Sequence, residues 1–175
     1  MSLARSELAY AKIVEEFAAI KTADGYRTDP FVTTVIRESS KMQGECEIGI
    51  EMGAIEVEIE GWTDNAGQLE AVVNELIPVY VVGTVKSDTD TDGKGTKLKA
   101  ALDALTHDVR RVGVVLYTKY INETVAPGAW NIVTSSDRPK IKVEQALGLG
   151  KNFNVGKCQL TFTIKIRNED QTFSA

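Results

Sequence analysis

The chain has 175 residues, of which 43% are hydrophobic and 26% are charged, and its formal net charge is −5. A chain of this length buries roughly 70% of its unfolded surface in one domain, so it needs no disulfide or metal for stability. The acidic balance argues against a protein that grips nucleic acid, because such proteins carry a basic stripe. The short basic groups Lys97–Lys99 and Arg110–Arg111 are flanked by acidic residues, and we expect no specific DNA binding.

The two cysteines, Cys46 and Cys158, lie far apart at apolar positions of strand-like patterns. We interpret them as buried free thiols, the alternative being one disulfide in a secreted protein. The N-terminal segment carries frequent charges and has no apolar signal-peptide region. No apolar run reaches the roughly 20 residues of a membrane helix, so we expect no membrane partner and synthesis in the cytoplasm.

In chain order, the first predicted element is an amphipathic helix over residues 3–21, which Asp24-Gly25 would end because glycine readily adopts the left-handed conformation. A strand is predicted at Phe31–Ile36, after Pro30. Two alternating runs on either side of Met52-Gly53 then predict an antiparallel hairpin with one wet face. The apolar face holds Cys46, Ile48, Ile50, Met52, Ile55, Val57 and Ile59, and the wet face holds Glu56, Glu58 and Glu60. We interpret these glutamates as solvated, with docking on a basic partner as the alternative.

Residues 65–77 fit either a short helix or an extended connection, and Pro78 leads into a predicted strand at Val79–Val85 with a bulge at Gly83. An acidic loop follows, and then a second amphipathic helix of three to four turns that begins at Thr96. Its apolar positions are Leu98, Leu102, Leu105 and Val109. After it, Val112–Ile121 is predicted to be a strand.

Residues 122–140 are predicted to be a loop or an arm, interrupted by the apolar run Trp130–Val133. The clearest predicted strand comes near the end of the chain, where five apolar residues alternate strictly with polar ones. Its apolar residues are Cys158, Leu160, Phe162, Ile164 and Ile166. Residues 168–175 are predicted to be a polar tail. The order of elements predicts one α+β domain over residues 1–175, in which two amphipathic helices pack on an antiparallel or mixed β-sheet.

Catalytic residue types are scarce in the sequence. The one histidine, His107, lies beside Asp108 on the second predicted helix, and no motif presents a nucleophile to it. One histidine and two isolated cysteines do not make a zinc site. We therefore predict no catalytic residue, no cofactor and no metal, and a protein that is not an enzyme.

Two motifs resemble ligand-binding loops without completing them. Asp88, Asp90, Asp92 and Gly93 match the first half of a calcium-binding EF-hand loop, but Lys99 stands where the bidentate glutamate belongs. We interpret this segment as an acidic loop whose charge suits the following helix N-terminus, with cation binding as the alternative. Residues 150–157 resemble a phosphate-binding loop, but they have one residue too many between the glycines and lead into a strand.

The segment from residue 79 to residue 108 carries a resemblance to a known family. The strand Val79–Val85 runs into an acidic loop and then into the helix Leu98–Asp108, with a helix before this unit and an alternating strand after it. This order resembles the tail terminator, or neck, proteins of long-tailed bacteriophages. The segments 61–78 and 122–157 depart from the shortest of these proteins, so the resemblance assigns them no role.

The resemblance implies an α+β structural subunit that forms a ring, typically a homohexamer. Such a ring caps the tail tube and joins it to the head connector, and DNA passes through its pore without specific binding. The protein would be assembled in the host cytoplasm and reside in the virion. Candidate assembly contacts are Asp88, Asp90, Asp92, Lys94, Trp62 and Trp130. Each tryptophan is alternatively a plug at the end of the sheet.

Other functions fit the same sequence. The chain is alternatively another neck or tail component, such as a head-completion or tail-tube protein. It is also compatible with a non-catalytic module that binds a cation or another ligand. An enzyme would require a perturbed carboxylate in a pocket, which no sequence pattern reveals.

Overall fold

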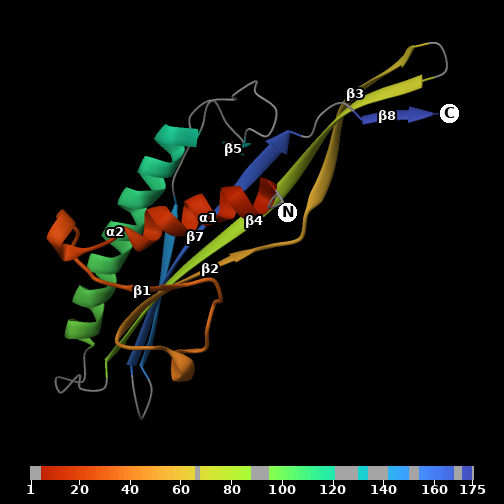
Figure 1. Cartoon of the computed structure of the whole chain (residues 1–175). Helices are drawn as coiled ribbons and strands as arrows, with labels where there is room; N and C mark the ends of the chain where they lie inside the picture. The colour runs from red at the N-terminus through yellow and green to blue at the C-terminus, as the bar shows by residue number, and fades with distance from the viewer. Residues whose placement is uncertain are drawn as a thin grey trace.

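The computed structural model describes residues 5–65, 68–87, 95–120, 130–133, 142–149, 154–167 and 171–174. For residues 60–65, 68–72, 149, 167 and 171–174 it describes only the backbone. The described chain is an α+β fold in which two helices cover a mixed, eight-stranded sheet (Figure 1). The helices are α1 (Arg5–Ala18) and α2 (Thr96–Tyr120). The strands are β1 (Phe31–Thr33), β2 (Cys46–Met52), β3 (Glu56–Asn65), β4 (Gln68–Ser87), β5 (Trp130–Val133), β6 (Val143–Leu149), β7 (Asn154–Arg167) and β8 (Gln171–Ser174).

Two long antiparallel strands, β4 and β7, form the centre of the sheet. Along one edge of β4, β2 and β3 pair one after the other, and β7 and β8 pair along the opposite edge. The outer edge of β7 pairs with β6 and β5 in the same end-to-end manner, and β1 adds in parallel to β2. A strand of 20 residues such as β4 therefore has room for a helix-covered half and a second half that extends farther.

The hydrophobic core lies between the two helices and one face of the sheet. The five alternating apolar residues predicted near the end of the chain are all buried on this face of β7, which confirms that prediction. Their cross-strand neighbours on β4 include Val79, Val81 and Gly83, and Ile48 and Ile50 of β2 continue the same face. The helices complete it with Ala9, Ile13 and Phe17 of α1 and with Leu98, Leu102, Leu105, Val109, Val112 and Leu116 of α2.

The predicted hairpin around Met52-Gly53 is wrong. β2 and β3 do not pair with each other, because each pairs with β4. Gly53 lies at the junction, where its N–H donates to the Pro78 carbonyl at 2.7 Å, and a Cβ at this position would lie 2.7 Å from the Pro78 ring. The backbone N and C=O of a strand residue point to the same edge of the strand. The nitrogen of Pro78, which carries no hydrogen, therefore points to the gap between β2 and β3, and no ladder hydrogen bond is lost there.

The predicted strand at Val112–Ile121 is also wrong, because α2 is 25 residues long and continues from Val112 to Tyr120. Val112 and Leu116 extend the apolar stripe of the helix and are both buried. The β-branched residues of this segment favour strands locally, but burial against the sheet decides the helical state.

Smaller differences concern the bounds of the elements. The first helix ends at Ala18, and Gly25, with φ 79°, ends the short 3₁₀ turn Thr22–Asp24 that follows it. β1 ends at Thr33 instead of Ile36. Residues 68–77, left open as helix or extended chain, are extended within β4, and its pairing passes through Gly83 without a bulge.

The C-terminal part of the chain differs from the prediction in one respect. Residues 171–174 of the predicted polar tail form β8, which pairs with β4. The run Trp130–Val133 forms β5 on β7. Three further predictions lie wholly or partly outside the described residues. They are the rest of the predicted loop or arm, the acidic loop at 88–94 and the start of the single domain at residue 1.

Candidate assembly surface

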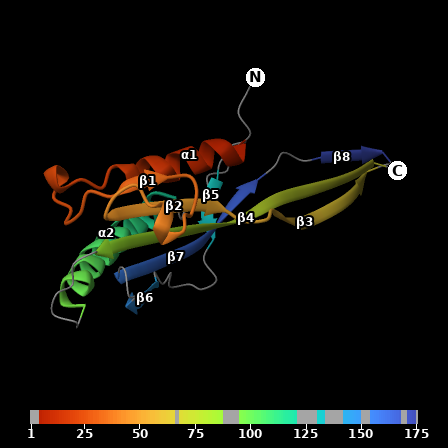
Figure 2. The same cartoon turned by 90° about the horizontal axis from the view of Figure 1, so that it is seen from below.

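A ribbon of strands extends beyond the helix-covered part of the sheet. It consists of β3 and the half of β4 that pairs with it, residues 68–76, and we call these strands the ribbon. Both views show it leaving the body on the side away from α2, with β8 along its second edge (Figures 1 and 2). An isolated two-stranded ribbon is at best marginally stable in water, and β8 adds only four residues to this one, so a surface packed against it would stabilise the extension.

One face of the ribbon is apolar and open to solvent. Val57 pairs with Glu75, which pairs in turn with the buried Ile166, so this is the same sheet face that the helices cover in the body. Ile55, Val57 and Ile59 are 54%, 64% and 63% exposed. The core face of the sheet thus continues past the end of the helix layer. A contiguous exposed apolar patch of this kind marks an interaction site.

The ribbon also carries the acidic excess of the whole chain. Between residues 55 and 76 there is no lysine or arginine, and the acidic residues number six: Glu56, Glu58, Glu60, Asp64, Glu70 and Glu75. Taking these six from the 25 acidic residues of the chain leaves 19, against 20 basic residues. The rest of the protein is therefore close to neutral. Among the described side chains, Lys165 of β7 lies 3.8 Å from Glu58 at the base of the ribbon.

The outward face of α2 has the opposite charge. This helix contains five lysines and arginines and two aspartates, and one of these, Asp108, is fully buried. Lys99, Arg110 and Val114 lie on the side opposite the buried stripe, and Val114 is 51% exposed. Arg110 makes no ion pair with any residue that the structure describes. The exposed Asp103 lies on the same side, so the outward face of α2 carries a small basic excess with an apolar residue in it.

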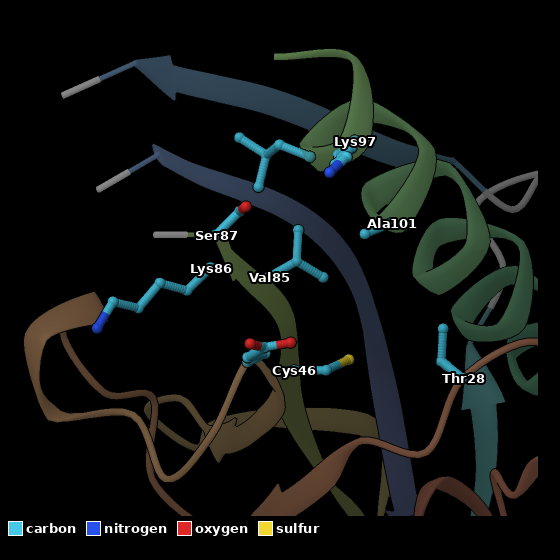
Figure 3. A pocket seen from close by; sticks show the side chains of 9 residues that line it. Thr28, Cys46, Val85, Lys86, Ser87, Lys97 and Ala101 are labelled. Carbon is cyan, nitrogen blue, oxygen red and sulfur yellow. The ribbon is translucent and has the colours of Figure 1, made fainter. Parts of the chain in front are cut away.

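A pocket of about 530 Å³ lies between the start of α2 and the ends of β2 and β4 (Figure 3). Lys97 and Ala101 reach it from the helix, and Cys46 lies at its inner wall. Burial raises the pKa of the Cys46 thiol to about 12, so the thiol is protonated at neutral pH and is a poor nucleophile. The pocket therefore holds no activated cysteine nucleophile.

The ionisable residues that are buried hold segments of the fold in place. Asp108 accepts hydrogen bonds from the Arg27 N–H at 2.9 Å and the Thr28 hydroxyl at 2.8 Å, and its other oxygen lies 3.2 Å from the half-exposed His107 ring. Glu47 of β2 accepts from the Gln43 N–H at 3.0 Å. Within the described ranges, no three histidine, cysteine or acidic side chains cluster as metal ligands would. The carboxylates of Asp108 and Glu47 thus hold neighbouring segments of the chain together by hydrogen bonds.

Among the predicted assembly contacts, Trp130 has a described side chain. It is half-buried on β5 and stacks on Tyr120 at the end of α2, with the ring centroids 4.1 Å apart. Trp62 lies on β3 of the ribbon opposite Ala71, at a position where only the backbone is described. Asp88, Asp90, Asp92 and Lys94 lie outside the described residues. Their roles as assembly contacts or cation ligands stay predictions.

The residues that the sequence did not single out are those of the exposed ribbon face. Ile55, Val57 and Ile59 alternate with glutamates and were predicted to form the apolar face of a hairpin. Alternation shows that the residues share a face, but it does not show what covers that face. The complete lack of lysine and arginine from 55 to 76 is the signal that distinguishes this segment.

Comparison with known protein families and curated proteins does not assign the chain to a family. No protein-family model matches the chain, and no curated protein matches it at a significant level. Neither α1 nor α2, the helices in the described part of the chain, is both long and apolar enough to cross a membrane.

Proposed function

We propose that this protein is a non-catalytic structural subunit of an assembly, and specifically a ring-forming tail terminator of a long-tailed bacteriophage. The observation that carries the proposal is the ribbon, which extends an acidic and partly apolar surface away from a compact, helix-covered body. A monomer gains nothing from solvating Ile55, Val57 and Ile59, whereas a subunit in a ring can cover them with its neighbour.

The fold supports the resemblance from which the specific role is drawn. The strand and the helix of the unit at residues 79–108 are present as the second half of β4 and as α2. The alternating final strand is present as β7, next to β4 in the sheet. The resemblance was read from the order of elements, and the described elements keep that order.

The described chemistry supports a structural role over a catalytic one. Asp108 and Glu47 are fully or almost fully buried, and both are engaged in hydrogen bonds that hold neighbouring segments. Burial also raises the pKa of Cys158, to about 11, so the second thiol is protonated as well. Lys99 and Arg110 of α2 lie outward on the helix surface, away from the pocket that Lys97 lines.

In this role the subunit contacts three kinds of partner. Copies of itself form the ring, the tail tube protein lies on one side, and the head–tail connector lies on the other. DNA passes through the pore without being held, which suits a subunit with net charge −5. Such a protein resides in the neck of the virion after assembly in the host cytoplasm.

The test is the mass of the purified full-length chain, measured by multi-angle light scattering over a range of concentrations and followed by negative-stain imaging. We expect closed rings with a central hole, either free in solution or at the ends of added tail tubes. Val57→Ser in the ribbon should reduce ring formation, and the control is Val35→Ser, which makes a half-exposed valine outside the ribbon polar. A chain that stays monomeric at every concentration and leaves tube ends bare would rule the proposal out.

A further inference from the structure

We infer that the apolar face of the ribbon packs on the outward face of α2 of a second copy of this chain. The inference rests on the proposed assembly role and adds to it the two surfaces that meet. Four features of the molecule support this contact: the size of the ribbon, its charge, the position of α2 within the subunit, and the match between individual residues.

The ribbon is large enough to serve as an interface. β3 has ten residues, which corresponds to a strand about 34 Å long, and three strands side by side are about 14 Å wide. Because β8 pairs with only four residues of β4, one face of the ribbon with β8 spans roughly 400 Å² in projection. This is the same order as the about 800 Å² that each partner buries in a standard interface, with side chains and the adjacent body adding to it.

Charge selects the partner surface. Two ribbons that meet by their apolar faces would place Glu75 of one copy near Glu75 of the other, within ribbons that each carry six acidic residues and no lysine or arginine. Such like-charge contact opposes association. The outward face of α2 offers the complementary sign in Lys99 and Arg110, together with the exposed apolar side chain of Val114. A symmetric ribbon-to-ribbon dimer is thus disfavoured, and a contact between two different surfaces is favoured.

The two surfaces cannot meet within one molecule. The ribbon leaves the body on the side away from α2 in both views (Figures 1 and 2). A contact between them must join two copies head to tail, and repetition of such a heterologous contact closes a ring when the rotation between copies allows it. The neighbour's α2 would then continue the helix layer over the part of the sheet face that the subunit's own helices leave bare.

Individual residues match across this contact. Glu75 lies directly across from Val57 on the ribbon, so their Cβ atoms are about 5 Å apart on one face. Arg110 precedes Val114 by one helical turn, which places their Cβ atoms about 6 Å apart on the helix surface. When Val114 packs on Val57, Arg110 therefore comes within reach of Glu75. Glu75 on this face of the ribbon thereby gains an arginine partner.

The first test is disulfide cross-linking between copies. Val57→Cys and Val114→Cys are made in separate full-length chains that differ in tag length, and the two are mixed under mild oxidation. The native Cys46 and Cys158 stay in place, because burial raises the pKa of both thiols and slows their reaction. Val35→Cys, at a valine that is also half-exposed, replaces Val114→Cys in the matched control mixture. Circular dichroism confirms that each variant folds.

We expect a cross-linked dimer of mixed tag length from Val57→Cys with Val114→Cys, at least tenfold more than from the control mixture. Cross-linking of Val57→Cys to itself at the same yield would overturn the inference in favour of a ribbon-to-ribbon contact. Rings that form without the mixed cross-link would overturn the inference and leave the proposed function standing. A strictly monomeric chain that ignores tube ends would overturn both.

The second test is charge reversal, read out by light scattering. Glu75→Arg and Arg110→Glu alone should each weaken self-association by about tenfold, since each places like charges in contact. The two changes together in one chain should restore most of the lost association, because the pair is rebuilt with its signs exchanged. Two outcomes would count against the contact between Arg110 and Glu75. One is that Arg110→Glu does not change self-association, and the other is that the double variant loses as much association as the two single variants lose together.

Discussion

The Thr28 hydroxyl donates a hydrogen bond of 2.8 Å to the carboxylate of Asp108, 80 residues farther along the chain. Asp108 lies on the buried side of α2 and is fully inaccessible to solvent. The same oxygen accepts a 2.9 Å bond from the Arg27 N–H. These bonds fasten the connection between α1 and β1 to the middle of α2. The only buried aspartate of the described residues is therefore an anchor of the helix layer to the sheet edge.

Replacement of Asp108 by alanine should lower the free energy of unfolding by about 3 kcal/mol, because the Arg27 N–H and the Thr28 hydroxyl lose their acceptor in a partly buried site. Asp108→Asn keeps one acceptor oxygen and should cost less. Urea unfolding monitored by circular dichroism measures both. Asp103→Ala, an exposed aspartate on the same helix, is the control and should change stability by less than about 0.5 kcal/mol. Equal losses of unfolding free energy for Asp103→Ala and Asp108→Ala would show that the hydrogen bonds of Asp108 contribute nothing to stability.

Gly83→Ala should destabilise the fold by about 1–3 kcal/mol through overpacking. A Cβ at Gly83 would lie 2.7 Å from the Cys158 Sγ and 2.9 Å from a Leu105 methyl group. Thermal or urea unfolding checks the change. Gly148→Ala is the matched control, because its new Cβ would meet no atom closer than 3.8 Å. In the double variant Gly83→Ala/Cys158→Ala, the combined loss should be smaller than the sum of the two single losses, since removal of the sulfur makes room.

The contact at Gly83 also shows what local patterns predict well and what they do not. The alternation of β7 and the heptad-like leucines at the start of α2 both reflect burial against a neighbouring layer, so they predicted the correct elements. Gly83 was predicted to mark a bulge. Its actual reason is the close approach of Leu105 from a helix more than 20 residues away, which no local pattern contains.

Pairing partners were equally out of reach of the sequence. Met52 and Gly53 separate two alternating runs, and the nearest pairing for such runs is a hairpin. In the structure Met52 lies opposite Val79 and Glu56 lies opposite Leu76, so both runs use the same distant strand. Both runs pair with β4 because its 20 residues offer more ladder hydrogen bonds than a hairpin between the two runs would.

The candidate assembly surface was hidden for a related reason. Val57 and Ile59 have the same alternating pattern as Ile48 and Ile50, yet the first pair is exposed and the second is fully buried. The difference is the length of the helix layer, which ends before it reaches β3. Sequence reasoning predicts the face of a residue from its own strand, whereas exposure depends on elements elsewhere in the fold.

Asn74→Leu should leave stability unchanged or raise it by about 1 kcal/mol. The Asn74 side chain is fully buried, and its amide nitrogen and oxygen have no hydrogen-bond partner among the described residues. An apolar side chain of similar size removes the cost of the unmade hydrogen bonds. Urea unfolding measures the effect, with Asn74→Asp as the contrasting variant, which should destabilise because it buries a charge. A loss above 1 kcal/mol for Asn74→Leu would reveal a bond that this amide makes in solution.

The stability of the fold should decrease at alkaline pH because of its two thiols. Burial raises the pKa of Cys46 from 9.0 to about 12 and that of Cys158 from 9.0 to about 11. The folded state thus keeps both thiols neutral, while the unfolded chain ionises them near pH 9. The stabilisation from the neutral thiols is complete below pH 9 and is lost as the pH rises toward 11 and 12. In this window each thiol should lower the free energy of unfolding by up to about 1.4 kcal/mol per pH unit.

The measurement is a series of urea unfolding curves between pH 8 and pH 11, on the wild type and on the double variant Cys46→Ala/Cys158→Ala. Burial raises the pKa of Tyr10 and Tyr117 as well, so both proteins should lose some stability at high pH. The tyrosines are common to the two proteins, and the difference between the two profiles therefore isolates the thiols. We expect the wild type to fall more steeply above pH 9. Parallel profiles would mean that the thiols ionise in the folded protein as readily as in the unfolded chain.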